Sequence, residues 1–127
     1  RTDGMVLKWI YKYGSNNNMI EDEAYKNGSF LSKTVYKYDV AGKLIGKIIF
    51  KIGDKPDSTV NYKYDSNGNK IEECWFLADD SPYYKYTYKY DIKGNPVEKA
   101  TYKGITQSGK KIWLLTRFNA REYFYYD

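Results

Sequence analysis

Acidic residues are the first candidates for chemistry in this sequence, because it contains no His and so lacks the most common general base. They cluster at Glu21–Glu23, Glu72–Glu73 and Asp79–Asp80, with Glu98 standing alone. A glycosidase needs two carboxyl groups roughly 5–10 Å apart across a cleft, whereas neighbours along a strand point to opposite faces. Glu21, Glu72 and Glu98 also share one position of an internal repeat. We therefore expect cross-strand pairing with Lys, and no enzyme activity.

Thiol and metal chemistry have little support in the sequence. The single Cys, Cys74, cannot form an internal disulfide or a cysteine zinc site. It shares a repeat position with Ile48 and Ala100, which predicts a small buried hydrophobic side chain. The segment Asp65–Asn69 resembles a calcium loop only superficially, because its Gly comes too early and no twelfth-position Glu follows. We expect no metal site and no cofactor.

Aromatic residues are the better candidates for binding, since the chain contains 16 Tyr and three Trp. Exposed rings can stack on sugars or bases, and nearby Lys side chains attract anionic polymers. Aromatic residues that break the repeat are the most informative, because folding alone explains those that obey it. The alternative is that these rings cover the ends and edges of a sheet. The residues predicted to bind a ligand are Trp75, Tyr83, Tyr84, Tyr86 and Trp113; Trp9 and residues 123–126 also lie outside the repeat pattern.

The charge pattern argues against a nucleic-acid partner. The net charge is +5, but the basic residues are almost all Lys and are spread along the chain. Lys is a hydrated point charge, whereas Arg makes the bidentate and stacking contacts typical of nucleic-acid sites. The pattern favours a solvated strand face protected by Lys. No segment approaches the ~20 consecutive apolar residues of a membrane-spanning helix.

These residues are placed by a repeat with a period of about 26 residues. The tripeptide Tyr-Lys-Tyr occurs at 11–13, 36–38, 62–64 and 88–90. Counted from its last Tyr, which is column zero, the following columns align without gaps: Asp in column one, Gly in column four, Ile or Val in column seven and an aromatic ring in column twelve. In the first repeat, Gly14 and Asn17 replace the Asp and the Gly.

Each repeat predicts a β-hairpin. The arm alternates strictly, most clearly over Tyr84–Tyr90, so that both rings of Tyr-Lys-Tyr share one face and Lys takes the other. In Asp65–Asn69 the Asp can accept backbone N–H groups and Gly68 can adopt positive φ, which suits a type I turn with a Gly bulge. Asn17 tolerates the same left-handed geometry.

The return strands are predicted at 43–50, 69–76 and 95–102. Their apolar columns seven and twelve have opposite parity, which predicts a bulge between them or a core on both faces. Longer connections are expected at 26–32, 53–58, 78–82 and 104–110. A degenerate fifth unit would rise over 112–119, turn, and return over 122–126.

The predicted fold class is all-β. We expect a single domain over residues 1–127, built as an antiparallel meander of about five hairpins and about ten strands. A twisted single sheet and a sheet partly closed towards a barrel remain alternatives. A high Tyr content suits a thin sheet, because a Tyr ring can be buried while its hydroxyl stays in water.

The turn columns resemble the YD repeats of Rhs-type bacterial surface proteins. This chain differs in its longer period, its Tyr-Lys-Tyr arm and its small size. The composition is also similar to that of small secreted gut Bacteroidetes proteins of unknown function. Both resemblances imply export to the periplasm or cell surface. The residues that carry the resemblance are Tyr38-Asp39, Gly42-Lys43-Leu44, Tyr64-Asp65, Gly68-Asn69, Ile71, Tyr90-Asp91, Gly94-Asn95 and Val97.

The sequence favours a structural or interaction module without catalytic activity, and the resemblance implies that this module is exported. Its partner would be another protein or a cell-envelope polymer. The alternative function is a carbohydrate-binding module that uses the aromatic rings outside the repeat.

Overall fold

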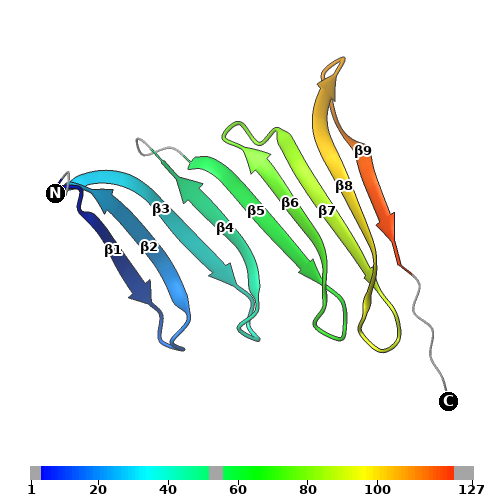
Figure 1. Cartoon of the computed structure of the whole chain (residues 1–127), viewed down its shortest axis with the longest axis horizontal. Coiled ribbons are helices and arrows are strands. Elements are labelled where there is room, and N and C mark those ends of the chain that lie inside the picture. Colours follow the sequence, from blue (N-terminus) through cyan, green and yellow to red (C-terminus); the bar gives the residue numbers. More distant parts are fainter. Residues whose placement is uncertain (1–3, 52–55, 122–127) are drawn as a thin grey trace. The chain divides into compact units, whose positions relative to one another are not determined.

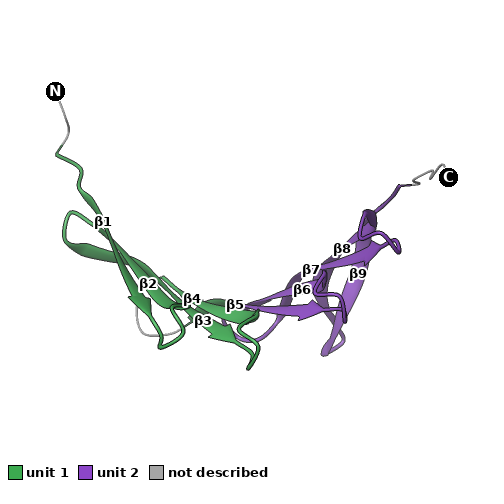
Figure 2. Cartoon of the chain, turned by 90° about the horizontal axis from the view of Figure 1, so that it is seen from below, with its two compact units in different colours: residues 1–59 green, residues 60–127 purple. Residues whose placement is uncertain are grey.

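The structure of the protein is a computed structural model that describes residues 4–51 and 56–121. The chain divides into two compact units, residues 1–59 and residues 60–127, which we describe separately (Figure 2). The described residues contain strands and no helix. The nine strands are β1 (Leu7–Tyr13), β2 (Met19–Lys26), β3 (Ser29–Tyr38), β4 (Leu44–Phe50), β5 (Pro56–Tyr64), β6 (Lys70–Leu77), β7 (Pro82–Tyr90), β8 (Pro96–Gln107) and β9 (Lys110–Ala120).

The strands form an antiparallel meander in which each strand pairs with its neighbour in the chain (Figure 1). This confirms the predicted all-β fold. The order begins at β1 and ends at β9, so among the described residues the sheet is open and not closed into a barrel. The rising strand of the fifth unit is β9, while its predicted return strand at 122–126 lies outside the described residues. The single domain over residues 1–127 stays a prediction.

Each Asp-containing arm ends in the five-residue turn that its sequence predicts. In Asp65–Asn69, one carboxylate oxygen of Asp65 accepts the N–H groups of Asn67 and Asn69, both at 2.9 Å. Gly68 has a φ of +86°, a backbone conformation that strains a residue with a Cβ. The turns that begin at Asp39 and Asp91 repeat these bonds.

The first repeat builds the same turn from different residues. The Gly14 N–H donates to the Asn18 carbonyl at 2.8 Å, and Asn17 adopts a φ of +63°. This confirms the prediction that Asn supplies the left-handed position. Asp80, with a φ of +64°, plays the same part in a turn over residues 77–81 that connects β6 to β7.

The long connections predicted at 26–32 and 104–110 are wrong. Asn27-Gly28 and Ser108-Gly109 are two-residue turns in which both φ angles are positive, as in type I′ hairpins. β3 therefore begins at Ser29, and β8 continues to Gln107. Asn-Gly is a strong signal for a two-residue hairpin turn. The polar residues on either side of it also resemble a loop, so the predicted connection was too long. The connection predicted at 53–58 falls partly outside the described residues, and β5 begins at Pro56.

Column seven of the repeat forms a β-bulge. Lys12 lies opposite Glu21 and Tyr13 opposite Met19, so Ile20 is an extra residue in β2. Ile45 and Val97 are extra in β4 and β8 in the same way. The predicted irregularity is thus present, and it falls on column seven itself. A second shift leaves one extra residue in three of the arm strands: Leu31, Tyr83 and Thr116.

Each unit is one layer thick, and its two faces differ (Figure 2). We call the face with the Tyr-Lys-Tyr rings the tyrosine face and the opposite one the lysine face. The buried apolar side chains among the described residues are Ala24, Val60, Cys74 and Ala100. Most of the large rings are only half-buried. The shallow core predicted from the Tyr content is therefore confirmed.

Candidate functional site

Four of the five predicted binding residues meet in the second unit. Trp75 of β6 lies directly opposite Tyr84 of β7. The Tyr84 and Tyr86 rings are stacked, with 18° between their planes and 6.4 Å between their centroids. Tyr83 is the extra residue of the bulge, and its ring centroid lies 4.3 Å from that of Tyr84. Because Trp75, Tyr84 and Tyr86 point to the tyrosine face, they form one aromatic surface.

The fifth residue, Trp113, lies on the opposite face. It packs edge-on against Phe76 with 6.0 Å between ring centroids, and the Lys85 ammonium lies 5.2 Å from its ring. Phe76 follows Trp75 in β6, so the two side chains point to opposite faces. Trp75 and Trp113 therefore cannot contact the same small ligand.

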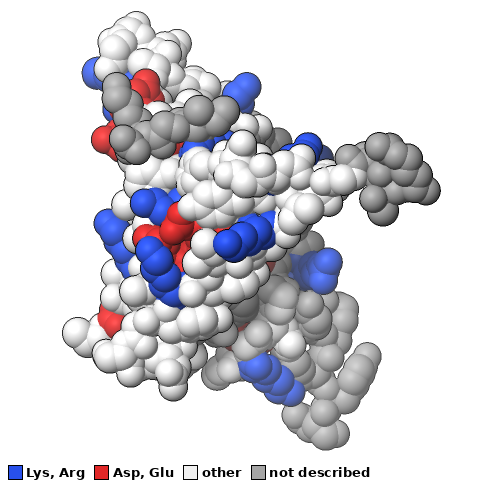
Figure 3. Space-filling view, turned by 90° about the vertical axis from the view of Figure 1, so that its left-hand side faces the viewer, with Lys and Arg blue, Asp and Glu red and all other residues white. Residues whose placement is uncertain are grey.

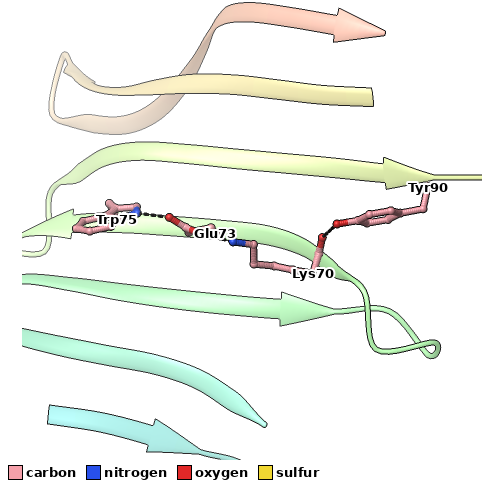
Figure 4. Close-up of polar contacts among 4 residues, drawn as sticks. All are labelled: Lys70, Glu73, Trp75 and Tyr90. Atoms are coloured by element: carbon pink, nitrogen blue, oxygen red, sulfur yellow. Dashed lines mark hydrogen bonds and ion pairs between the residues drawn. The ribbon is translucent and has the colours of Figure 1, made fainter. Parts of the chain in front are cut away.

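A polar network fixes the tyrosine face beside Trp75. The indole N–H of Trp75 donates to one oxygen of Glu73 at 2.6 Å, and the Lys70 ammonium pairs with the other oxygen at 2.7 Å (Figure 4). Burial lowers the pKa of Lys70, but the hydrogen bond and the negative charge of Glu73 outweigh it and leave the pKa raised. Glu73 thus serves as a positioning group for both the indole and the ammonium.

Rings and ammonium groups alternate across the tyrosine face of the second unit. The Lys70 nitrogen lies 5.6 Å from the Tyr62 ring centroid and 5.3 Å from that of Tyr88. The Lys99 nitrogen lies 5.2 Å from the Tyr86 ring and 5.7 Å from the Tyr88 ring. These cation–π contacts hold the rings in fixed positions. The resulting surface can stack against a flat ligand and offer it cationic hydrogen-bond donors.

The lysine face of the same unit contains an apolar hollow of about 520 Å³, comparable in size to small-ligand sites. Residues of β6, β7, β8 and β9 line it, and two of them, Leu115 and Phe118 of β9, are more than half exposed. The sequence predictions missed these two residues. The signal that could have found Leu115 is the run Ile112-Trp113-Leu114-Leu115, which breaks the alternation of apolar and polar residues. The side chains that line the hollow are the apolar Ile71, Ala100, Leu115 and Phe118 and the ring of Tyr102, together with the polar Thr87, Lys89 and Glu98.

The repeat carboxylates make the cross-strand ion pairs that were predicted. The distances are 2.9 Å for Lys12–Glu21, 3.3 Å for Lys63–Glu72 and 3.5 Å for Lys89–Glu98. Acidic groups also lie among basic ones on the surface shown in Figure 3. Among the residues that the structure describes, no group of three or more acidic or Cys side chains could hold a metal ion. These carboxylates are therefore explained by sheet pairing.

Cys74 is buried on the lysine face, as its repeat position predicts. Burial raises the pKa of its thiol to about 11, and the nearby Glu72 carboxylate adds to this effect. A thiol in such surroundings is a poor nucleophile at neutral pH.

In the part of the chain that the structure describes, no helix has the length and hydropathy of a membrane span.

The comparisons with known proteins define the fold and no activity. No known family profile matches the chain, and no curated protein matches it. A crystal structure of a protein of unknown function from Bacteroides fragilis is similar, with a TM-score of 0.66, 15% identity and 94% of each chain covered. This likeness shows a shared fold.

Two further solved structures are DUF3836 family proteins. The one from Parabacteroides distasonis has a TM-score of 0.34 and 19% identity, with 92% of each chain covered. The one from Bacteroides vulgatus has a TM-score of 0.33 and 18% identity, and the match covers 91% of this chain and 98% of that chain. The resemblance to YD repeats stays a prediction.

Proposed function

We propose that the protein is a non-catalytic interaction module of the periplasm or cell surface, and that its partner is another protein. The supporting observation is the lysine face of the second unit, where Leu115 and Phe118 are exposed and line an apolar hollow. Contiguous exposed apolar surface is typical of interaction sites. The location follows from the resemblance to secreted proteins.

The chemistry of the hollow suits a protein side chain. Ile71, Ala100 and Leu115 offer it only apolar atoms, and Tyr102 contributes a ring. The Lys89–Glu98 ion pair also lines the hollow. Protein interfaces usually combine apolar contacts with polar and charged groups in this way.

Site-specific photo-crosslinking in the source organism tests this proposal. A benzoylphenylalanine at Phe118 is expected to give a discrete protein adduct. The same group at Ile92, which is 98% exposed in a turn of the same unit, is the matched control and is expected to give none. Equal labelling from both positions, or no adduct from Phe118, would contradict the proposal.

A second candidate function is carbohydrate binding on the tyrosine face. The stacked Tyr84 and Tyr86 rings and the fixed Trp75 indole support it, because sugar-binding surfaces use immobilised rings. The ammonium groups of Lys70 and Lys99 add donors for hydroxyl or acidic groups.

Affinity electrophoresis on a panel of immobilised glycans tests this second function. Trp75→Ala is expected to abolish any retardation, because it removes a ring of the aromatic surface. Trp113→Ala, on the opposite face, is the control and is expected to leave retardation unchanged. A wild-type chain that no glycan retards would rule the function out.

A further inference from the structure

The edge strand β1 exposes a row of large side chains on the tyrosine face of the first unit. Leu7, Trp9, Tyr11 and Tyr13 are each between 51% and 57% exposed. They occupy alternate positions, so they form one row along the strand. Among the described residues, β1 pairs only with β2. Its outer edge therefore forms no backbone ladder with another described strand.

The interior of the sheet shows what normally lies beside such a strand. In β3, the Tyr36 hydroxyl donates to the Asp22 carboxylate of the preceding return strand at 2.6 Å. The Tyr38 hydroxyl donates to the backbone carbonyl of Met19 at 2.6 Å. β1 is an arm strand like β3, and Tyr11 and Tyr13 occupy the repeat positions of Tyr36 and Tyr38. Tyr11 and Tyr13 on β1 thus correspond to the Tyr residues with which β3 contacts β2. Among the described residues, β1 has no strand on its outer side that corresponds to β2.

We propose that β1 binds an extended acidic segment of another protein, which pairs with it as an antiparallel strand. The β2–β3 register defines the chemistry of this segment. Asp22 lies opposite Thr34 and Glu23 opposite Lys33. The equivalent positions in β1 are Trp9 and Lys8. The segment therefore carries one acid opposite Trp9, to accept the Tyr11 hydroxyl, and a second acid opposite Lys8.

The charges of the two edge strands disfavour a second copy as the occupant. β1 contains Lys8 and Lys12, and β9 contains Lys110, Lys111 and Arg117, but neither strand contains an acidic residue. Full-register antiparallel pairing of β1 with β1 of another copy would place Lys8 opposite Lys12, which is destabilising, and pairing with β9 would join two strands whose charged residues are all cationic. An acidic strand meets opposite charge instead, and main-chain bonds to the outer edge of β1 supply further affinity.

This inference concerns the first unit, whereas the proposed protein-binding face and the carbohydrate surface lie in the second. Each of them can fail while the others hold.

An NMR titration of the full chain with a synthetic peptide tests the inference. The probe is Met-Ile-Glu-Asp-Glu-Ala-Tyr-Lys, the sequence of β2. It is expected to shift the backbone amide signals of residues 7–13. Changing the Asp and the last Glu of the peptide to Asn and Gln is expected to weaken binding about tenfold, because two charge-assisted contacts are lost.

Two protein variants sharpen the test. Tyr11→Phe removes the proposed donor and is expected to weaken peptide binding severalfold. Tyr36→Phe is the matched control, since its hydroxyl already bonds to Asp22 inside the sheet. It is expected to leave peptide affinity unchanged, with well-dispersed spectra showing that it folds.

Three results would overturn the inference. One is the absence of shifts in residues 7–13 at millimolar peptide. Another is equal affinity for the acidic peptide and its amide version. The third is a dimer by sedimentation that broadens the signals of residues 7–13, because the occupant would then be a second copy.

Discussion

The Tyr90 hydroxyl donates a 2.7 Å hydrogen bond to the backbone carbonyl of Lys70. Tyr38 makes the equivalent bond to Met19. In both cases the last Tyr of an arm is joined to the first residue of the preceding return strand, next to the Ile in column seven. The repeated Tyr therefore connects one hairpin to the next, in addition to forming its own strand.

Tyr90→Phe should lower the free energy of unfolding by about 1 kcal/mol, the usual net value of one such bond. Tyr13→Phe, at the same repeat position on the edge strand, should change it by less than about 0.5 kcal/mol. Urea denaturation followed by fluorescence measures both. Equal losses in the two variants would refute the role assigned to the Tyr90 bond.

Gly104→Ala should destabilise the fold strongly. A Cβ at Gly104 would overlap the backbone carbonyl of Pro82, and backbone cannot move away as a flexible side chain can. Overpacking of this kind costs about 1–3 kcal/mol. Gly14→Ala is the control, because its nearest neighbour is the Ile20 methyl at 3.2 Å, and its cost should be smaller. The urea midpoints of the two variants decide the order, and an unchanged midpoint for Gly104→Ala would contradict the predicted clash.

Gly94→Ala measures the free-energy cost of placing a residue with a Cβ at the left-handed position of the turn. No atom lies within 4 Å of the new Cβ, and the φ of Gly94 is +86°. The cost should therefore be the intrinsic one of a left-handed residue, about 1–2 kcal/mol.

Conversely, Asn17→Gly should stabilise the first repeat slightly, because Asn17 already adopts positive φ. A loss of stability in Asn17→Gly would show that the Asn side chain contributes more than its conformation.

Cys74 should resist thiol reagents in the folded protein. Its pKa of about 11 leaves almost no thiolate at pH 8, and the side chain is buried. Reaction with a disulfide reagent should be slow in buffer and complete in urea. Rapid stoichiometric labelling of the native chain would contradict the burial of this thiol.

Alkaline pH should destabilise the second unit. Burial raises the pKa of Tyr62 and Tyr88, and that of Lys70 is raised as well. A raised folded-state pKa gives stability that is fully present below the ordinary value, about 10 for Tyr, and is lost as the pH rises through the folded-state value. The urea midpoint should therefore fall above about pH 10, and less steeply in Tyr88→Phe. A midpoint that does not change with pH in this range would contradict the prediction.

Local features of the fold were predictable from the sequence. The Asp39, Asp65 and Asp91 turns follow from the conformational freedom of Gly and the acceptor capacity of Asp, both of which are properties of a few adjacent residues. Cross-strand pairs such as Lys12–Glu21 were also predictable, because they span one short hairpin whose register the turn fixes. The turn at Asn27-Gly28 was equally local but was obscured by neighbouring polar residues.

The candidate surfaces were predictable only in part. Trp75, Tyr84 and Tyr86 were selected because they break the repeat, and the structure places them together on one face. Their role in ligand binding stays a prediction. The same signal grouped Trp113 with them, although that residue lies on the other face. The apolar hollow beside Phe118 was missed altogether, because it needs residues from four strands, and the bulge at Thr116 determines which residues of β9 share a face with it.

By itself, the sequence determined an all-β meander of hairpins, the chemistry of its turns and the pairing of its Lys and Glu residues. These depend on contacts within one hairpin, where the chain separation is small and alternation fixes direction. The tertiary structure decided that the sheet of the described strands is open and which aromatic rings share a face. It also decided which side chains β1 exposes along its edge. These depend on the register between successive hairpins, and each bulge changes which residues lie opposite one another along the strand pair.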